Sequence, residues 1–254
     1  MKFALVAPTP YQWILNYLSI GYHMVEPYQS ILDEHYLTAY QLYGRSGHFI
    51  MVDNGAAEIN REGNPVVDFD YTLEVANTVR ASEIVLPDKL FDSGWTINHT
   101  LANASKVPIP NRAVCPQGVD WDDWENCLDV LTGRIEFATL CITKALEFQE
   151  GGRAHAMEIV MKKGLHKRMN IHLLGLAING ETIREEITNV AKVYSGIRGL
   201  DSGRPIAFAQ RGVSVEDHKV PLPLKWDYVE VDKLTESLLS NVTTTMEICN
   251  ACDI

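Results

Sequence analysis

The sequence predicts an α/β protein in which eight parallel strands close into a (β/α)₈ barrel of the TIM type, a single domain over residues 1–254. Three observations lead to this fold. Short apolar runs alternate with segments of helical periodicity, eight such runs fit in 254 residues, and the later units repeat at roughly 30 residues each. Strands that alternate with helices pair in parallel, and eight of them favour a closed barrel. A doubly wound open sheet is the alternative fold.

The expected strands are apolar runs that end in a polar or glycine-containing turn. In chain order they are 3–8, 19–25, 48–55, 83–88, 113–118, 135–142, 171–177 and 197–203. The second run has the weakest support, because the helix before it would be short. Between the later runs we expect helices at 27–43, 70–81, 94–105, 120–131, 151–163 and 181–194. Residues 218–254 should form a C-terminal loop and a closing helix at 232–248.

Composition narrows the classes of protein that fit. A chain that is 46% hydrophobic can bury a sizeable core, and its net charge of -11 argues against bulk electrostatic coating of nucleic acid. A local basic groove stays compatible with that charge. No apolar stretch is long enough for a membrane span and no signal pattern opens the chain, so we expect a cytoplasmic protein without membrane contact. The five cysteines are then expected to be reduced.

Polar residues at the C-terminal ends of the expected strands indicate where a site would lie. Barrel enzymes carry their chemistry at this end, in the loops that lead from each strand to the next helix. Asp201 stands out because it follows apolar Leu200 in "GLDSG", where an ionised carboxylate is costly unless it is paired or used in chemistry. Asp53, Asp88 and Gln117 occupy other strand ends. Three acids and a glutamine would therefore converge on one mouth.

Each of these residues also has a purely structural explanation. Asp53 could cap a helix or close a turn, and Asp88 after Pro87 could do the same. Gln117 before a glycine could satisfy backbone groups of its loop. The functional interpretation depends on the set, because independent caps would not need to share one face of the barrel.

Five short segments, in their order along the chain, resemble the guanine transglycosylase superfamily: MVDNGAAE, VLPDKL, CPQGVD, HLLGLA and GLDSGRP. This superfamily contains the tRNA-guanine transglycosylases and shorter relatives that insert 7-deazaguanine bases into DNA. The resemblance covers roughly residues 1–205 and rests on the order and spacing of the segments.

The resemblance implies two catalytic residues. Asp201 matches the aspartate that attacks C1′ of the target nucleotide, and Asp53 matches the acid that handles the proton of the leaving and incoming bases. These residue types suit the chemistry, because base exchange with retention requires two inversions and hence a covalent intermediate. Guanine leaves poorly as an anion, so an acid must protonate it. Asn54, next to Asp53 in the same turn, is expected at the base-binding pocket.

The resemblance also implies how the base is recognised. Asp88 matches the aspartate that accepts hydrogen bonds from the N–H edge of guanine, and an acceptor-only side chain suits those donors. Gln117 and Gly118 match the turn that recognises the base carbonyl. Leu174 and Gly175 match the pair that ends the seventh strand and covers the base.

The chain departs from the tRNA enzymes in three features. Their zinc site has three closely spaced cysteines and a distant histidine, whereas only Cys249 and Cys252 lie close together here, with no histidine after them; zinc and other cofactors are not expected. Ala57 stands where the bacterial tRNA enzymes have an aromatic residue, so stacking on the base must come from elsewhere. The chain ends soon after the closing helix, which favours the compact, DNA-modifying relatives.

The expected function is therefore exchange of guanine in DNA for a 7-deazaguanine base, such as 7-cyano-7-deazaguanine, as the resemblance to bacteriophage and bacterial DNA-modifying enzymes implies. Alternatives are a transglycosylase that acts on tRNA or a nucleoside, and a barrel that only binds a base. A duplex target would have to be flipped out of the stack. Arg198, Arg204 and Arg211 would contact phosphates, or else form ion pairs with nearby acids. The oligomeric state stays open, a homo-oligomer included.

Overall fold

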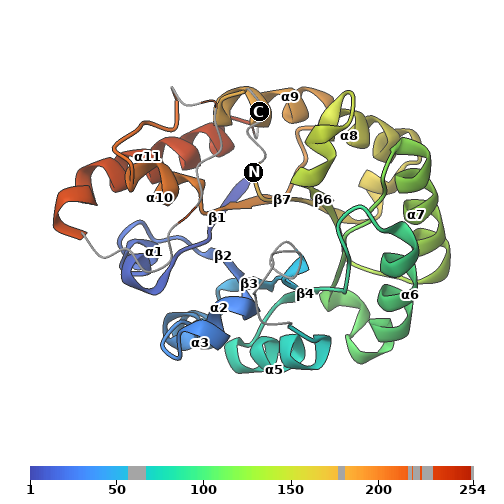
Figure 1. The fold of residues 1–254 in the computed structure, drawn as a ribbon, viewed down its shortest axis with the longest axis horizontal. Coiled ribbons are helices and arrows are strands. Elements are labelled where there is room, and N and C mark those ends of the chain that lie inside the picture. Colours follow the sequence, from blue (N-terminus) through green and yellow to red (C-terminus); the bar gives the residue numbers. More distant parts are fainter. Residues whose placement is uncertain (57–66, 177–180, 217–218, 220–223, 225–230, 253–254) are drawn as a thin grey trace.

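The computed structural model describes residues 1–56, 67–176, 181–216, 219, 224 and 231–252. Within these ranges, eight parallel strands form one sheet that nearly closes into a barrel, and helices surround it (Figure 1). The strands are β1 Lys2–Leu5, β2 Tyr22–Val25, β3 Phe49–Val52, β4 Glu83–Val85, β5 Arg112–Val114, β6 Thr139–Thr143, β7 Asn170–Leu174 and β8 Gly199–Ser202. Each overlaps one of the eight expected runs, which confirms the α/β class and the parallel, barrel-like arrangement.

Neighbouring strands follow chain order from β2 to β8, and β1 pairs with β8. In this register Ala4 lies opposite Asp201, and Cys141 of β6 lies opposite His172 of β7. Strands β1 and β2 contact each other, but no ladder joins them in the part of the chain that the structure describes. The ring of strands therefore has a single seam, between β1 and β2.

The barrel has an inner and an outer apolar cluster. The inner cluster consists of Ala4, Val6, Tyr22, Met24, Met51, Val85, Ala113, Cys115 and Cys141, with Phe49 and Leu174 packed against it. Successive side chains of a strand point to opposite faces of a sheet. Leu173 and Leu200 therefore pack outward in the larger cluster, under the helices. Their neighbours His172 and Asp201 face the interior, where they contact each other.

The helices cover the outer face of the sheet (Figure 1). They are α1 Trp13–Tyr17, α2 Pro27–Leu32, α3 Leu37–Arg45, α5 Phe69–Val79, α6 Ser93–Asn103, α7 Trp121–Arg134, α8 Gly152–Lys162, α9 Ile183–Val193, α10 Arg204–Ala209 and α11 Val231–Ala251. The expected short helix before β2 is α1. Helix α11 packs with α10 and β1 and is the expected closing helix, whereas most of the loop expected from residue 218 lies outside the described residues.

One helix expectation was wrong. Residues 27–43 were expected to be a single helix, but α2 ends at Leu32 and α3 begins at Leu37. Asp33 adopts extended backbone angles (φ -139, ψ 107), and its carboxylate accepts a hydrogen bond of 2.9 Å from the N–H of His35. Aspartate competes in this way with the helical hydrogen bonds of the backbone, so it ends the helix locally.

Side-chain caps define where several helices begin. Asp68, Asp92 and Asp120 each accept a hydrogen bond from the backbone N–H three residues later, at the start of α5, α6 and α7. These caps fix the ends of the loops that follow β3, β4 and β5. None of the helices in the described ranges combines the length and hydrophobicity that a membrane span requires.

Candidate active site

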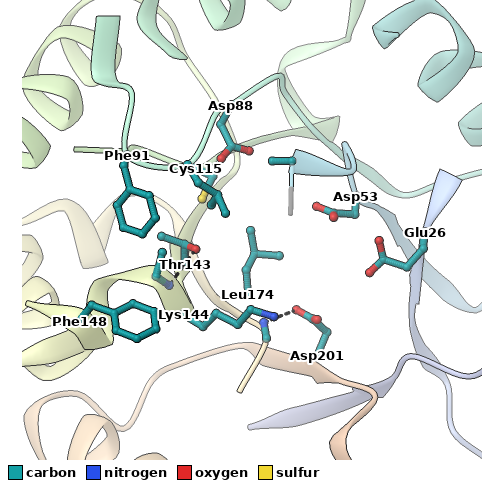
Figure 2. Close-up of a pocket in the computed structure, with 14 residues that line it drawn as sticks. Glu26, Asp53, Asp88, Phe91, Cys115, Thr143, Lys144, Phe148, Leu174 and Asp201 are labelled. Carbon is teal, nitrogen blue, oxygen red and sulfur yellow. Dashed lines mark hydrogen bonds between the residues drawn. The ribbon is translucent and has the colours of Figure 1, made fainter. Parts of the chain in front are cut away.

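A cavity of about 190 Å³ opens at the C-terminal end of the barrel. The three expected acids, Asp53, Asp88 and Asp201, all line it, as do Leu174 and Gly175. Figure 2 shows Asp53 and Asp201 on one side of this cavity. The structure thus brings together residues from the ends of β3, β4, β7 and β8, which are far apart in the sequence.

Asp201 is held by two hydrogen bonds that end on the same oxygen. Its Oδ1 accepts from the backbone N–H of Gly175 at 3.0 Å and contacts Nε2 of His172 at 3.0 Å. Gly175 has a φ of +68°, in the left-handed region that favours glycine, and a Cβ there would lie 2.8 Å from Cδ of Lys144. The tight turn after β7 therefore brings a backbone donor to the Asp201 carboxylate.

Asp53 is placed by the sheet and by the turn after β3. Its backbone N–H donates to the carbonyl of Val25, the last residue of β2, at 2.9 Å. Gly55, with a φ of +74°, donates its backbone N–H to Oδ2 of Asp53 at 3.4 Å. The turn thus holds the carboxylate at the mouth, where Glu26, the residue after β2, lines the same cavity. Glu26 was not predicted as a site residue.

Asp88 is buried and receives two short hydrogen bonds. Nδ2 of Asn54 donates to its Oδ1 at 2.5 Å, and Nε2 of Gln117 donates to its Oδ2 at 2.5 Å. Burial raises the pKa of Asp88 to about 6, and the two hydrogen bonds act in the opposite direction. Asp88 is consequently charged at neutral pH, although it is much easier to protonate than an exposed aspartate.

Asn54 and Gln117 lie behind Asp88 and are not among the residues that line the cavity. Asn54 also donates to the carbonyl of Leu86 at 2.7 Å, which ties the turn after β3 to the end of β4. Gly118 packs on the start of α7, because a Cβ at this position would overlap the backbone nitrogen of Trp124. Asn54 and Gln117 therefore support Asp88, whereas Gly118 lets the turn after β5 pack closely on α7.

His172 is a site residue that the sequence analysis missed. It is fully buried on β7, and its ring joins Asp201 to the hydroxyl of Tyr22, which lies 2.9 Å from Nδ1. The sequence did contain a signal that could have identified it: a lone histidine in the apolar run IHLLGLA. This histidine stands two residues before Leu174 and hence on the same face of the strand.

Two aromatic side chains and a lysine complete the rim of the cavity. Phe91, after β4, is 44% exposed, and Phe148, after β6, is 78% exposed. Figure 2 shows both rings on the side of the cavity away from Asp201, while the side chain of Lys144 extends toward Asp201. Both rings are exposed to solvent at the cavity. Ala57, which stands where the bacterial tRNA enzymes have an aromatic residue, lies outside the described residues.

The structure places Arg198 away from this mouth. Its guanidinium donates to Glu83 through Nη1 at 2.5 Å and Nη2 at 2.7 Å, and it lies 4.7 Å from the ring centre of Phe49. Glu83 and Phe49 are the first residues of β4 and β3, at the opposite end of the barrel. The position of Arg198 favours the ion-pair alternative.

Arg204 and Arg211 lie on the C-terminal side of β8. Arg204 is the first residue of α10, and its backbone N–H donates to Oγ of Ser202 at 3.0 Å. Arg211 follows α10, and its Nη1 donates to the carbonyl of Ala207 at 3.0 Å. The expected contact of both residues with phosphates stays a prediction.

Cys249 of α11 and Cys252, which follows this helix, are not among the residues that line the cavity. The terminal amine of Met1 donates to the carbonyl of Cys249 at 3.4 Å. In the described ranges, no group of three histidine, cysteine or acidic side chains could hold a metal ion.

No protein-family model matches the chain, and no curated protein matches it. The geometry of the cavity is therefore the basis for any assignment.

Proposed function

We propose that the chain is a single (β/α)₈ barrel of the guanine transglycosylase type, which exchanges guanine in DNA for a 7-deazaguanine base. One observation carries the proposal. Asp53, Asp88 and Asp201 line one cavity at the C-terminal end of the barrel, although they come from three different strand ends. These three aspartates, which share the cavity with Glu26, suit a reaction that needs a nucleophile, a proton carrier and an acceptor for the base.

The proposed reaction has two displacements at C1′. In the first, an Asp201 oxygen bonds to C1′ while the bond from C1′ to N9 of guanine breaks, and Asp53 gives its proton to the leaving base. In the second, the incoming base loses its N9 proton to Asp53, and its N9 bonds to C1′ as the ester to Asp201 breaks. Two inversions give net retention, and neither step requires an oxidant or a metal-bound group.

Recognition of the base would fall to Asp88 and to the apolar walls. The Asp88 carboxylate is held by Asn54 and Gln117, so its remaining lone pairs can accept from the N–H edge of guanine. Leu174 would cover one face of the base. The exposed rings of Phe91 and Phe148 offer stacking surfaces for the flipped base or its neighbour, and stacking of this kind tolerates different sequences.

Contacts with the DNA backbone would be few. We propose phosphate contacts for Lys144, which lines the cavity, and for Arg204 and Arg211, which lie at the start of α10 and just after its end, and the net charge of -11 disfavours a wider basic surface. The salt dependence of DNA binding should therefore be shallow, with a log–log slope of about -2 to -3.

The test is incorporation of labelled 7-cyano-7-deazaguanine into DNA, tRNA or guanosine, each offered separately. The proposal predicts label in DNA, and none with Asp201→Asn. An exposed acid of α7, changed in Asp129→Asn, serves as the matched control and should retain full activity. Label in tRNA or guanosine alone would overturn the DNA assignment. Binding of the base without incorporation into any of the three would instead identify a barrel that only binds.

A further inference from the structure

A chain of buried polar groups runs through the barrel to Asp201. The hydroxyl of Tyr22 lies 2.9 Å from Nδ1 of His172, and Nε2 of His172 lies 3.0 Å from Oδ1 of Asp201. His172 is 0% exposed and Tyr22 is 4% exposed. No substrate can reach His172, so it can influence chemistry only through Asp201.

The direction of each hydrogen bond follows from the group at each end of the chain. A carboxylate can only accept, so Nε2 of His172 carries the proton in the contact with Asp201. Nδ1 of the neutral ring is then an acceptor, and the hydroxyl of Tyr22 donates its proton to Nδ1. Burial raises the pKa of Tyr22 well above its ordinary value, which keeps that proton on the hydroxyl. An accepting Nδ1 leaves the ring proton on Nε2, which then donates to Asp201.

We propose that His172 is a positioning residue that selects the attacking oxygen of Asp201, an inference that rests on the proposed function. His172 and the N–H of Gly175 both bind Oδ1, and the described residues supply no donor to Oδ2. Oδ1 is thereby held as the anchored oxygen of the carboxylate. Oδ2 is the oxygen that bonds to C1′ as the bond to guanine breaks.

Ionisable groups from several strands surround the His172–Asp201 pair. They are Tyr22 of β2, Glu83 of β4, Cys141 of β6, Arg198 before β8, Arg153 of α8 and Lys144 beside Gly175. Burial raises the pKa of Cys141 well above its ordinary value, so this thiol stays neutral. Of these ionisable groups, Tyr22 is the one in hydrogen-bond contact with the His172 ring, opposite Asp201.

The first test measures the tautomer of His172 directly, in the full chain labelled with ¹⁵N-histidine. The His172→Gln variant assigns its signals among the 8 histidines. The proposal predicts a neutral ring protonated at Nε2 at pH 7. A ring protonated at Nδ1, or at both nitrogens, would overturn it. This outcome does not depend on which reaction the protein performs.

The second test measures base exchange. His172→Leu removes the donor to Asp201 and should lower kcat by about 10- to 100-fold, with the KM for the base changed less than about threefold. In this variant the acid limb of the plot of kcat against pH should move to higher pH. The charged form of the Asp201 carboxylate loses the hydrogen bond from His172 and is therefore protonated more easily. His172→Gln places an amide N–H near the position of Nε2 and should restore most of kcat and the original pH profile.

Exposed His35 provides the matched control, since His35→Leu should change neither kcat nor the pH profile. Thermal unfolding of each variant separates loss of folding from loss of positioning, and Tyr22→Phe is the second variant if His172→Leu does not fold. Tyr22→Phe removes the donor to Nδ1 and should likewise lower kcat.

Two outcomes separate this proposal from the proposed function. An unchanged kcat in His172→Leu, or in a folded Tyr22→Phe variant, would overturn the positioning role and leave the transglycosylase assignment intact. Absence of exchange by the unaltered protein would overturn the assignment and leave the tautomer test valid.

Discussion

At the scale of single residues, burial changes the chemistry of Asp88. Its pKa is about 6 in the folded protein, against an ordinary value of 3.8. Between these two pH values the folded chain holds a proton that the unfolded chain has released. The contribution of Asp88 to the free energy of unfolding therefore falls as the pH rises from about 4 to about 6. The same burial that lowers this contribution also makes the Asp88 carboxylate a desolvated hydrogen-bond acceptor.

We expect the affinity for guanine to increase as the pH rises through about 6, because only the charged form of Asp88 accepts from both N–H groups of the base. Gln117→Met removes a hydrogen bond that lowers the pKa, so the midpoint should move up by about one unit. Calorimetric titration with guanine between pH 5 and pH 8 measures both midpoints. Affinity that is independent of pH would contradict the role of Asp88.

Asp201→Asn should abolish exchange and preserve the pocket. Asparagine has nearly the shape of aspartate, and its Oδ1 can accept from His172 and Gly175 as the carboxylate does. An amide is a poor nucleophile, so we expect the rate of exchange to fall by more than about 10⁴-fold. Affinity for the base should change less than about threefold. Residual exchange near the original rate would exclude Asp201 as the nucleophile.

At the scale of secondary-structure elements, the short turns after the strands carry the site. The turn at Gln117 and Gly118 joins β5 to α7, and it can approach α7 closely only without a Cβ at residue 118. The same turn supplies the donor from Gln117 to Asp88. This one turn thus determines both how α7 packs and how the Asp88 carboxylate is oriented.

Gly118→Ala should therefore lower the free energy of unfolding by about 1–3 kcal/mol, because the new methyl group meets backbone atoms that cannot move aside. Gly133, on an exposed face of the same helix, has no neighbouring atom within 4 Å of an added Cβ. Gly133→Ala should instead raise that free energy by about 0.5–1 kcal/mol. Urea denaturation compares the two variants, and equal effects would refute the role given to the turn.

The same elements show what the sequence could predict. Alternation of apolar runs with helical segments was enough to locate all eight strands, because burial inside a barrel requires that pattern. The positions of Asp53, Asp88 and Asp201 at strand ends followed from it. The break at Asp33 depends on one local hydrogen bond, and no periodicity encodes it.

Contacts between strands that are distant along the chain could not be predicted from the sequence. The partner of Arg198 is Glu83, on a strand 115 residues away, and local charge offered many other acids. The role of His172 depends on the register that sets it beside Asp201 and across from Tyr22. Phe91 lies in the loop after β4 and Phe148 ends a short 3₁₀ helix, Lys144–Phe148, so neither belongs to a periodic apolar run.

For the whole molecule, the Glu83–Arg198 pair joins two opposite walls of the barrel at its base. The side chains are 5% and 18% exposed, so both charges are largely desolvated. The pair also covers the rings of Tyr22 and Phe49 from below. Loss of one partner would leave the other charge buried alone.

Arg198→Met should consequently lower the free energy of unfolding by about 3–5 kcal/mol, since it strands the carboxylate of Glu83. Lys106→Met breaks the exposed pair with Asp70 and should change it by less than about 1 kcal/mol. Chemical denaturation measures both. If Arg198 instead bound phosphates, Arg198→Met would flatten the salt dependence of DNA binding and cost little stability.

The seam between β1 and β2 has a mechanical consequence. A ring whose strands are all joined by hydrogen bonds has a fixed circumference, whereas a ring with one unbonded joint can widen there without breaking a ladder. Glu26 follows β2 at this joint, so widening would enlarge the cavity beside Asp53. Widening there would leave the ladders from β2 to β8, and the ladder between β8 and β1, intact, and would therefore keep Asp88 and Asp201 at a constant separation.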